Sequence, residues 1–150
     1  QEDRREVLLE YAQIEAPVLD YLNAPNLFQQ LINEYKDVNA IIGSSAGGLI
    51  AYYLAQKLDK HCLLFNPALC HYSKMPFPHF FDKNYLKYMQ IVLGKQDEVI
   101  PYEESLKIIS NDISEKQNIE IHIINQMKHS YPISIFKQEI SLFFDKILQE

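Results

Sequence analysis

The feature that most constrains this chain is a glycine-rich turn between two apolar segments. The turn reads Gly43-Ser44-Ser45-Ala46-Gly47, and it joins a run that favours a strand to a run that favours a helix. Glycines two residues to either side of Ser45 let a strand turn sharply into a helix, because larger side chains there would clash. Such a turn strains the backbone of its central residue and holds its side chain clear of the sheet. Only Ser45 has this spacing, since Ser44 is not flanked in the same way.

The turn predicts a serine nucleophile at Ser45. The helix that follows would direct its N-terminal amides and its positive dipole end at the reacting group. The main-chain N–H of Ala46 is the expected donor to a developing oxyanion. The alternative is a glycine-rich turn that serves only close helix–strand packing or binds a phosphate. The turn lacks the lysine of a P-loop and the G-x-G-x-x-G spacing of a dinucleotide fold, which disfavours the phosphate alternative.

Patterns typical of strands and of helices alternate along the 150 residues. Strands are expected over residues 16–21, 38–42, 62–65, 90–93 and 119–124. Helices are expected over residues 3–14, 27–35, 49–58, 101–110 and 135–147, and an irregular aromatic segment over residues 68–88. Strands separated by helices imply parallel pairing in a layered α/β fold. No repeat or interdomain linker is visible, so the chain is expected to form a single domain.

A candidate acid and a candidate base follow the serine in the required order. Where this turn carries a nucleophile, the order along the chain is Ser, then Asp or Glu, then His. Asp97 stands in a short polar loop after the strand that ends near Gly94, where ligands gather in parallel sheets. Glu98 is the alternative acid. His129 follows the next expected strand and is the expected base.

The other histidines fit the base less well. His122 lies inside an expected strand, where side-chain alternation places it with Glu120 and opposite the isoleucines. His61, His71 and His79 precede Asp97 and so break the order. A loop histidine or a loop aspartate is by itself usually a surface residue, but three requirements of position are met here in sequence.

Together these stretches resemble the YqiA-like small esterases of the α/β-hydrolase superfamily. The resemblance is carried by residues 41–54, Phe65-Asn66-Pro67-Ala68, residues 93–100 and Lys128-His129-Ser130. It implies a three-layer α/β-hydrolase fold, with a mostly parallel sheet, helices on both faces and a minimal cap. It also implies a serine hydrolase that forms an acyl-enzyme on Ser45, with Asp97 and His129 completing the triad, and that needs no metal or cofactor. Small acyl esters or thioesters are the expected substrates.

The start of the chain departs from this family. Its members begin with a strand that ends in a His-Gly-type loop, which supplies the second oxyanion donor, whereas this sequence opens on a charged helical segment, residues 1–14. The missing strand would lie between those expected at 16–21 and 38–42. Its loss would leave buried backbone groups unpaired at about 1–3 kcal/mol each. The natural protein is therefore expected to carry roughly 10–15 further N-terminal residues.

The aromatic segment 71–88 has two interpretations. As a small cap it would form an apolar acyl pocket, with Tyr72, Met75 and Phe77 as candidate lining residues. Equally, it could be a loop packed on the body of the protein or a contact in a homo-oligomer.

Charge and cysteine content exclude several classes of partner. A net charge of −6 argues against nucleic acids and against electrostatic binding to anionic membranes. Cys62 and Cys70 lack the spacing of a metal or redox site, and Cys62 lies in an apolar run typical of a buried thiol. These features favour a cytoplasmic protein that acts on a small molecule. The rival hypothesis is a non-catalytic binding protein that retains the same fold.

Overall fold

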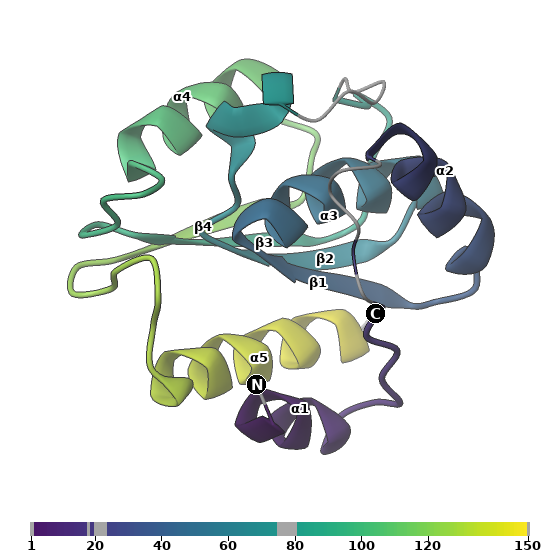
Figure 1. Cartoon of the computed structure of the whole chain (residues 1–150), viewed down its shortest axis with the longest axis horizontal. Coiled ribbons are helices and arrows are strands. Elements are labelled where there is room, and N and C mark those ends of the chain that lie inside the picture. The colour runs from purple at the N-terminus through teal and green to yellow at the C-terminus, as the bar shows by residue number, and fades with distance from the viewer. Residues whose placement is uncertain (1, 18, 20–23, 75–80, 150) are drawn as a thin grey trace. The chain divides into compact units, whose positions relative to one another are not determined.

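The chain folds into two compact units, which are described separately. The structure, a computed structural model shown in Figure 1, describes residues 2–17, 19, 24–74 and 81–149. The larger unit comprises Leu19–His129, and the smaller one comprises Gln1–Val18 with Ser130–Glu150. Ser45, Asp97 and His129 therefore all belong to the larger unit.

A four-stranded parallel sheet forms the centre of the larger unit. Its strands lie side by side in chain order: β1 (Ala40–Ser44), β2 (His61–Phe65), β3 (Met89–Gly94) and β4 (Ile119–Ile124). The register pairs Ser44 with Phe65, and Gly94 with Ile124. The carboxyl ends of all four strands are thus aligned, and the loops that leave them gather at one end of the sheet.

The strands predicted from apolar runs coincide with buried strands of the structure. β3 is buried along its whole length, and β2 from its second residue, which suits the apolar runs predicted at 90–93 and 62–65. The prediction for 119–124 is also confirmed. The strand expected over 38–42 lies two residues later because it runs directly into the turn at Ser45. Half of the strand expected over 16–21 falls outside the described residues, and residues 16, 17 and 19 are not in a strand.

Three helices cover one face of this sheet: α2 (Ala24–Glu34), α3 (Ser45–Leu58) and α4 (Tyr102–Asp112). The central helix is α3, which is buried continuously from Gly48 to Gln56. Its apolar side chains join those of Leu64 and Ile91 from the sheet in one hydrophobic cluster. The predicted helix at 49–58 is correct in place but begins four residues earlier, because the glycines are part of the helix.

In its described residues, 66–74 and 81–88, the segment between β2 and β3 is mostly irregular, as predicted. These residues include one short 3₁₀ helix, η2 (Leu69–Lys74), and neither helix nor strand between residues 81 and 88. Two tyrosines of this segment, Tyr85 and Tyr88, are almost fully buried. The described part of the segment therefore contributes to the core.

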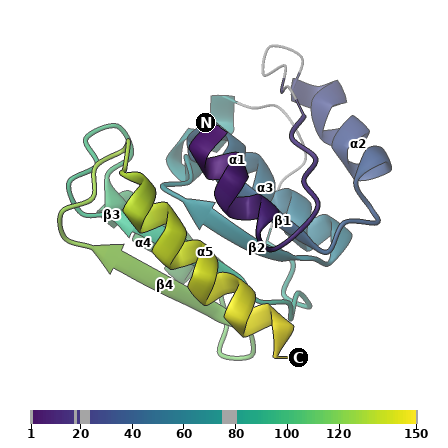
Figure 2. The ribbon, with the colours of Figure 1, turned by 90° about the horizontal axis from the view of Figure 1, so that it is seen from below.

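The smaller unit pairs α1 (Glu2–Leu9) with α5 (Ile133–Leu148), which lie side by side in Figures 1 and 2. The Arg4 guanidinium donates a hydrogen bond to the carbonyl of Tyr131 (2.9 Å) and lies 4.2 Å from the centre of its ring. Tyr11 stacks on Phe144 with 4.8 Å between ring centres. The expected helix over 3–14 is shorter than predicted, since the chain leaves α1 in a turn that brings Tyr11 to this stack.

Candidate active site

The turn at Ser45 has the strained geometry that its sequence predicts. β1 ends at Ser44 and α3 begins at Ser45, whose φ of 55° is in the left-handed region that only glycine adopts freely. Holding a non-glycine residue there costs about 1–3 kcal/mol. A Cβ at Gly43 would lie 2.4 Å from the carbonyl oxygen of Gly47, so residue 43 must be glycine for the strand and the helix to meet.

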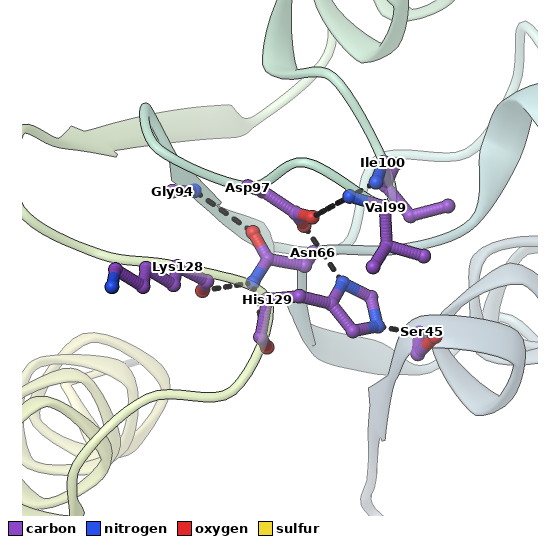
Figure 3. Close-up of polar contacts among 8 residues, drawn as sticks. All are labelled: Ser45, Asn66, Gly94, Asp97, Val99, Ile100, Lys128 and His129. Atoms are coloured by element: carbon purple, nitrogen blue, oxygen red, sulfur yellow. Dashed lines mark hydrogen bonds and ion pairs between the residues drawn. The ribbon is translucent and has the colours of Figure 1, made fainter.

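Three side chains from separate loops form a continuous hydrogen-bonded chain at this end of the sheet (Figure 3). The Oγ of Ser45 lies 2.9 Å from Nε2 of His129. On the other side of the imidazole ring, Nδ1 lies 2.8 Å from Oδ2 of Asp97. The structure thus brings together the three residues that the sequence predicts as nucleophile, base and acid.

Asp97 is fixed by its own loop. Its side chain is fully buried, and its Oδ1 accepts hydrogen bonds from the main-chain N–H groups of Val99 and Ile100, both at 2.8 Å. These two bonds aim the second oxygen at His129. Glu98, the alternative acid, is exposed, and the contact with His129 is made by Asp97.

Two other described histidines have different roles. His122 lies on β4, and its Nε2 is 3.7 Å from the carboxylate of Glu120. Nδ1 of His61 accepts a hydrogen bond from the main-chain N–H of Tyr88. These contacts agree with the sequence-based choice of His129, and His79 lies outside the described residues.

Ala46 is the second residue of α3. The first main-chain N–H groups of a helix have no carbonyl partner within the helix, and they carry the positive end of its dipole. The Ala46 N–H therefore belongs to the set of amides suited to an oxyanion formed at Ser45.

The predicted substrate pocket is described only in part. Tyr72 lies on η2 and is 41% exposed, so its ring is available at the surface. Met75 and Phe77 lie outside the described residues.

Sequence reasoning missed two residues that shape the site. A Cβ at Gly48 would lie 2.9 Å from both Cα and Cβ of Pro67, so this glycine lets α3 approach the turn after β2. Asn66 opens that turn with a φ of 42° and is almost fully buried. The residues that Asn66 contacts lie far along the chain, so no local sequence pattern pointed to its role.

The described residues contain no group of three His, Cys, Asp or Glu side chains able to hold a metal ion. Within the same part of the chain, no helix has the length and apolar character needed to cross a bilayer.

Solved structures similar to this chain include α/β hydrolases. MGS-M1, an α/β-hydrolase enzyme from a Medee basin deep-sea metagenome library, is 20% identical, with a TM-score of 0.60 over 93% of this chain and 70% of its own. α/β-Hydrolase domain-containing protein 10 from mouse is 14% identical, with a TM-score of 0.62 over 99% of this chain and 81% of its own. Est1E from Butyrivibrio proteoclasticus is 17% identical, with a TM-score of 0.61 over 81% of this chain and 68% of its own. At these identities the likeness shows the fold, which is the α/β-hydrolase fold.

At the level of sequence, no curated protein matches the chain significantly. A family match does exist, and it covers residues 3–90, more than half of the chain, including the turn at Ser45 and the Asn66-Pro67-Ala68 segment. The chain therefore belongs to the uncharacterised protein family UPF0227.

Proposed function

We propose that this protein is a serine hydrolase of the esterase type, with Ser45 as nucleophile, His129 as general base and Asp97 as the acid that orients it. The observation that carries the proposal is the chain of two short contacts, 2.9 Å from Ser45 to His129 and 2.8 Å from His129 to Asp97. A serine hydroxyl is a weak nucleophile unless an adjacent base removes its proton. The arrangement provides that base and a buried carboxylate behind it.

The reaction follows from these contacts. Nε2 of His129 accepts the hydroxyl proton as Oγ of Ser45 attacks the acyl carbon, and the carbonyl electrons move to the oxygen. The Ala46 N–H and the dipole of α3 stabilise that oxyanion. Collapse of the intermediate breaks the bond to the leaving group, which takes the proton from His129. Water, deprotonated by His129, then releases the acid from Ser45.

Asp97 contributes by holding the imidazole in one tautomer. Its carboxylate accepts the hydrogen bond from Nδ1–H, which leaves Nε2 unprotonated and directed at Ser45. The same carboxylate stabilises the imidazolium that forms during attack.

Small acyl esters or thioesters are the proposed substrates, and the cytoplasm is the proposed location. Support for a small substrate comes from the short segment between β2 and β3, which leaves little chain for a large cap. The two free cysteines are compatible with a reducing compartment. A panel of p-nitrophenyl esters and acyl-CoA thioesters separates the two substrate classes.

Covalent labelling with a fluorophosphonate probe tests the proposal. The wild-type protein is expected to be labelled at Ser45, as identified by peptide mass spectrometry. Ser45→Ala should abolish labelling, and His129→Ala should slow it by about a hundredfold or more, the usual contribution of a general base. His122→Ala is the matched control, because the His122 side chain is 26% exposed and that of His129 is 25% exposed.

A non-catalytic binding protein with the same fold predicts the opposite result. Failure of the folded wild-type protein to react at Ser45 would contradict the hydrolase proposal. Equal losses in His129→Ala and His122→Ala would contradict the assignment of the base.

A further inference from the structure

A single buried amide joins the segments that carry the acid and the base. Asn66 follows β2 directly, and its side chain uses both ends of the amide (Figure 3). Nδ2 donates to the carbonyls of Lys128 (3.0 Å) and His129 (3.2 Å). Oδ1 accepts from the main-chain N–H of Gly94 (2.8 Å). The side chain therefore spans from the end of β3 to the main chain of the proposed base.

The same turn is tied to the other two members of the site. The carbonyl of Gly94 accepts a hydrogen bond from the N–H of Asp97 (3.2 Å). Gly94, whose N–H is bound by Asn66, therefore also closes the loop that carries Asp97. Two residues after Asn66, the N–H of Ala68 donates to the carbonyl of Ser45 (2.9 Å). The turn from Asn66 to Ala68 thus contacts all three loops that meet at the site.

From these contacts we infer that Asn66 is a positioning residue, which sets the place of His129 relative to Asp97; the inference rests on the function proposed above. The position requires hydrogen-bond donors, a hydrogen-bond acceptor and a left-handed φ, and asparagine provides all three. Its planar amide offers two donors and an acceptor. It also tolerates the left-handed φ of 42° better than most residues with a side chain. Aspartate has the same shape, but it would place an oxygen instead of the NH₂ group against the carbonyls of Lys128 and His129, and these two hydrogen bonds would be lost.

The fold does not depend on this amide alone. The histidine segment is also held by hydrogen bonds from Lys95 N–H to the Ile124 carbonyl and from Gln96 N–H to the Met127 carbonyl, both 3.0 Å. Close packing of Gly94 against Met127 adds to them, since a Cβ at Gly94 would lie 2.5 Å from the Met127 carbonyl oxygen. Loss of the Asn66 amide is therefore expected to shift His129 without unfolding the sheet.

The test compares Asn66→Gly with Asp59→Gly. Both changes replace a left-handed non-glycine residue, and Asp59, with a φ of 57°, lies at the end of α3. Glycine relieves backbone strain at both places, so the variants differ mainly in the amide that is lost. Fluorophosphonate labelling and turnover of a p-nitrophenyl ester are measured well below the melting temperature. We expect Asn66→Gly to lower the labelling rate and kcat about tenfold or more with little change in KM, and Asp59→Gly to leave all three within twofold.

Asn66→Asp separates the two ends of the amide. Its carboxyl group can still accept from the Gly94 N–H, but it has no NH₂ group for the carbonyls of Lys128 and His129. We expect its labelling rate and kcat to fall about tenfold or more with little change in KM, whereas a purely structural role would lower the melting temperature and leave kcat of the folded protein unchanged. An Asn66→Asp or Asn66→Gly protein that labels within twofold of wild type would contradict the inference.

The remaining outcomes are also informative. Loss of the folded state in both Asn66 variants would show that the residue is structural and overturn a positioning role. Absence of labelling in the wild-type protein would overturn the proposed function itself, which is a separate result from a normal wild type with indifferent Asn66 variants.

Discussion

At the scale of single residues, the two carboxylate oxygens of Asp97 make different contacts. Oδ1 closes the loop by accepting from Val99 and Ile100, and Oδ2 contacts His129. The neighbouring Glu98 carries the same charge but is exposed. Neutralising each of these two adjacent carboxylates in turn therefore distinguishes the effect of losing a negative charge from the effect of losing the contact with His129.

Asp97→Asn is expected to slow fluorophosphonate labelling about a hundredfold or more while the protein stays folded. The carbonyl oxygen of the new amide can still accept from Val99 and Ile100, which preserves the loop. The NH₂ group cannot accept from Nδ1–H of His129, so the imidazole favours the wrong tautomer. Glu98→Gln removes one charge from the next residue and should label like wild type. A larger loss in Glu98→Gln than in Asp97→Asn would transfer the role of the acid to Glu98.

The sequence predicts the three residues of this site but not the residue that joins their loops. Ser45 stands in a local pattern, and Asp97 and His129 follow from chain order and from their places after strands. Asn66 acts on residues 28 to 63 positions further along the chain, and no short pattern connects them. Its role becomes visible only when the parallel sheet aligns the carboxyl ends of β2, β3 and β4.

At the scale of elements, the first turn of α3 shows tertiary packing overriding the intrinsic helix propensity of its residues. Glycine disfavours helix by about 1 kcal/mol relative to alanine, which favours a helix that begins after Gly47 and Gly48, as in the predicted range 49–58. The structure places Gly47 and Gly48 inside α3. The close approach of Gly48 to Pro67 explains why this helical position is a glycine, and that contact depends on tertiary structure.

Gly48→Ala therefore sets two effects against each other. Helix propensity alone would stabilise the protein by about 1 kcal/mol. The added Cβ would lie 2.9 Å from Cα and Cβ of Pro67, and neither atom belongs to a flexible side chain, so overpacking should cost about 1–3 kcal/mol. The expected result is a lower urea midpoint with an unchanged m-value, and a lower midpoint still for Gly48→Ser. A Gly48→Ala protein more stable than wild type would show that the turn at Pro67 moves freely.

At the scale of the whole molecule, the core buries several groups that titrate at high pH. Burial raises the pKa of the Cys62 thiol from 9.0 to about 12. Burial also raises the pKa of Tyr52, whose hydroxyl donates to Oδ2 of Asp112 (2.8 Å), and of Tyr85, whose hydroxyl donates to the carbonyl of Lys60 (2.6 Å). All three side chains belong to the larger unit, so its unfolding exposes them together.

These raised pKa values predict a loss of stability at alkaline pH. Each group releases its proton more easily in the unfolded chain, at about pH 9 for the thiol and about pH 10 for the phenols, than in the folded one. Their stabilisation is complete below pH 9 and declines as the pH rises toward 12. The thiol alone should lower the free energy of unfolding by about 3 kcal/mol at pH 11, because pH 11 is two units above its unfolded pKa of 9.0 and each unit contributes about 1.4 kcal/mol. Urea titrations from pH 7 to 11 measure the effect, and Cys62→Ala should flatten the decline above pH 9. A free energy of unfolding that stays constant to pH 11 would mean that these groups are not buried as protonated species.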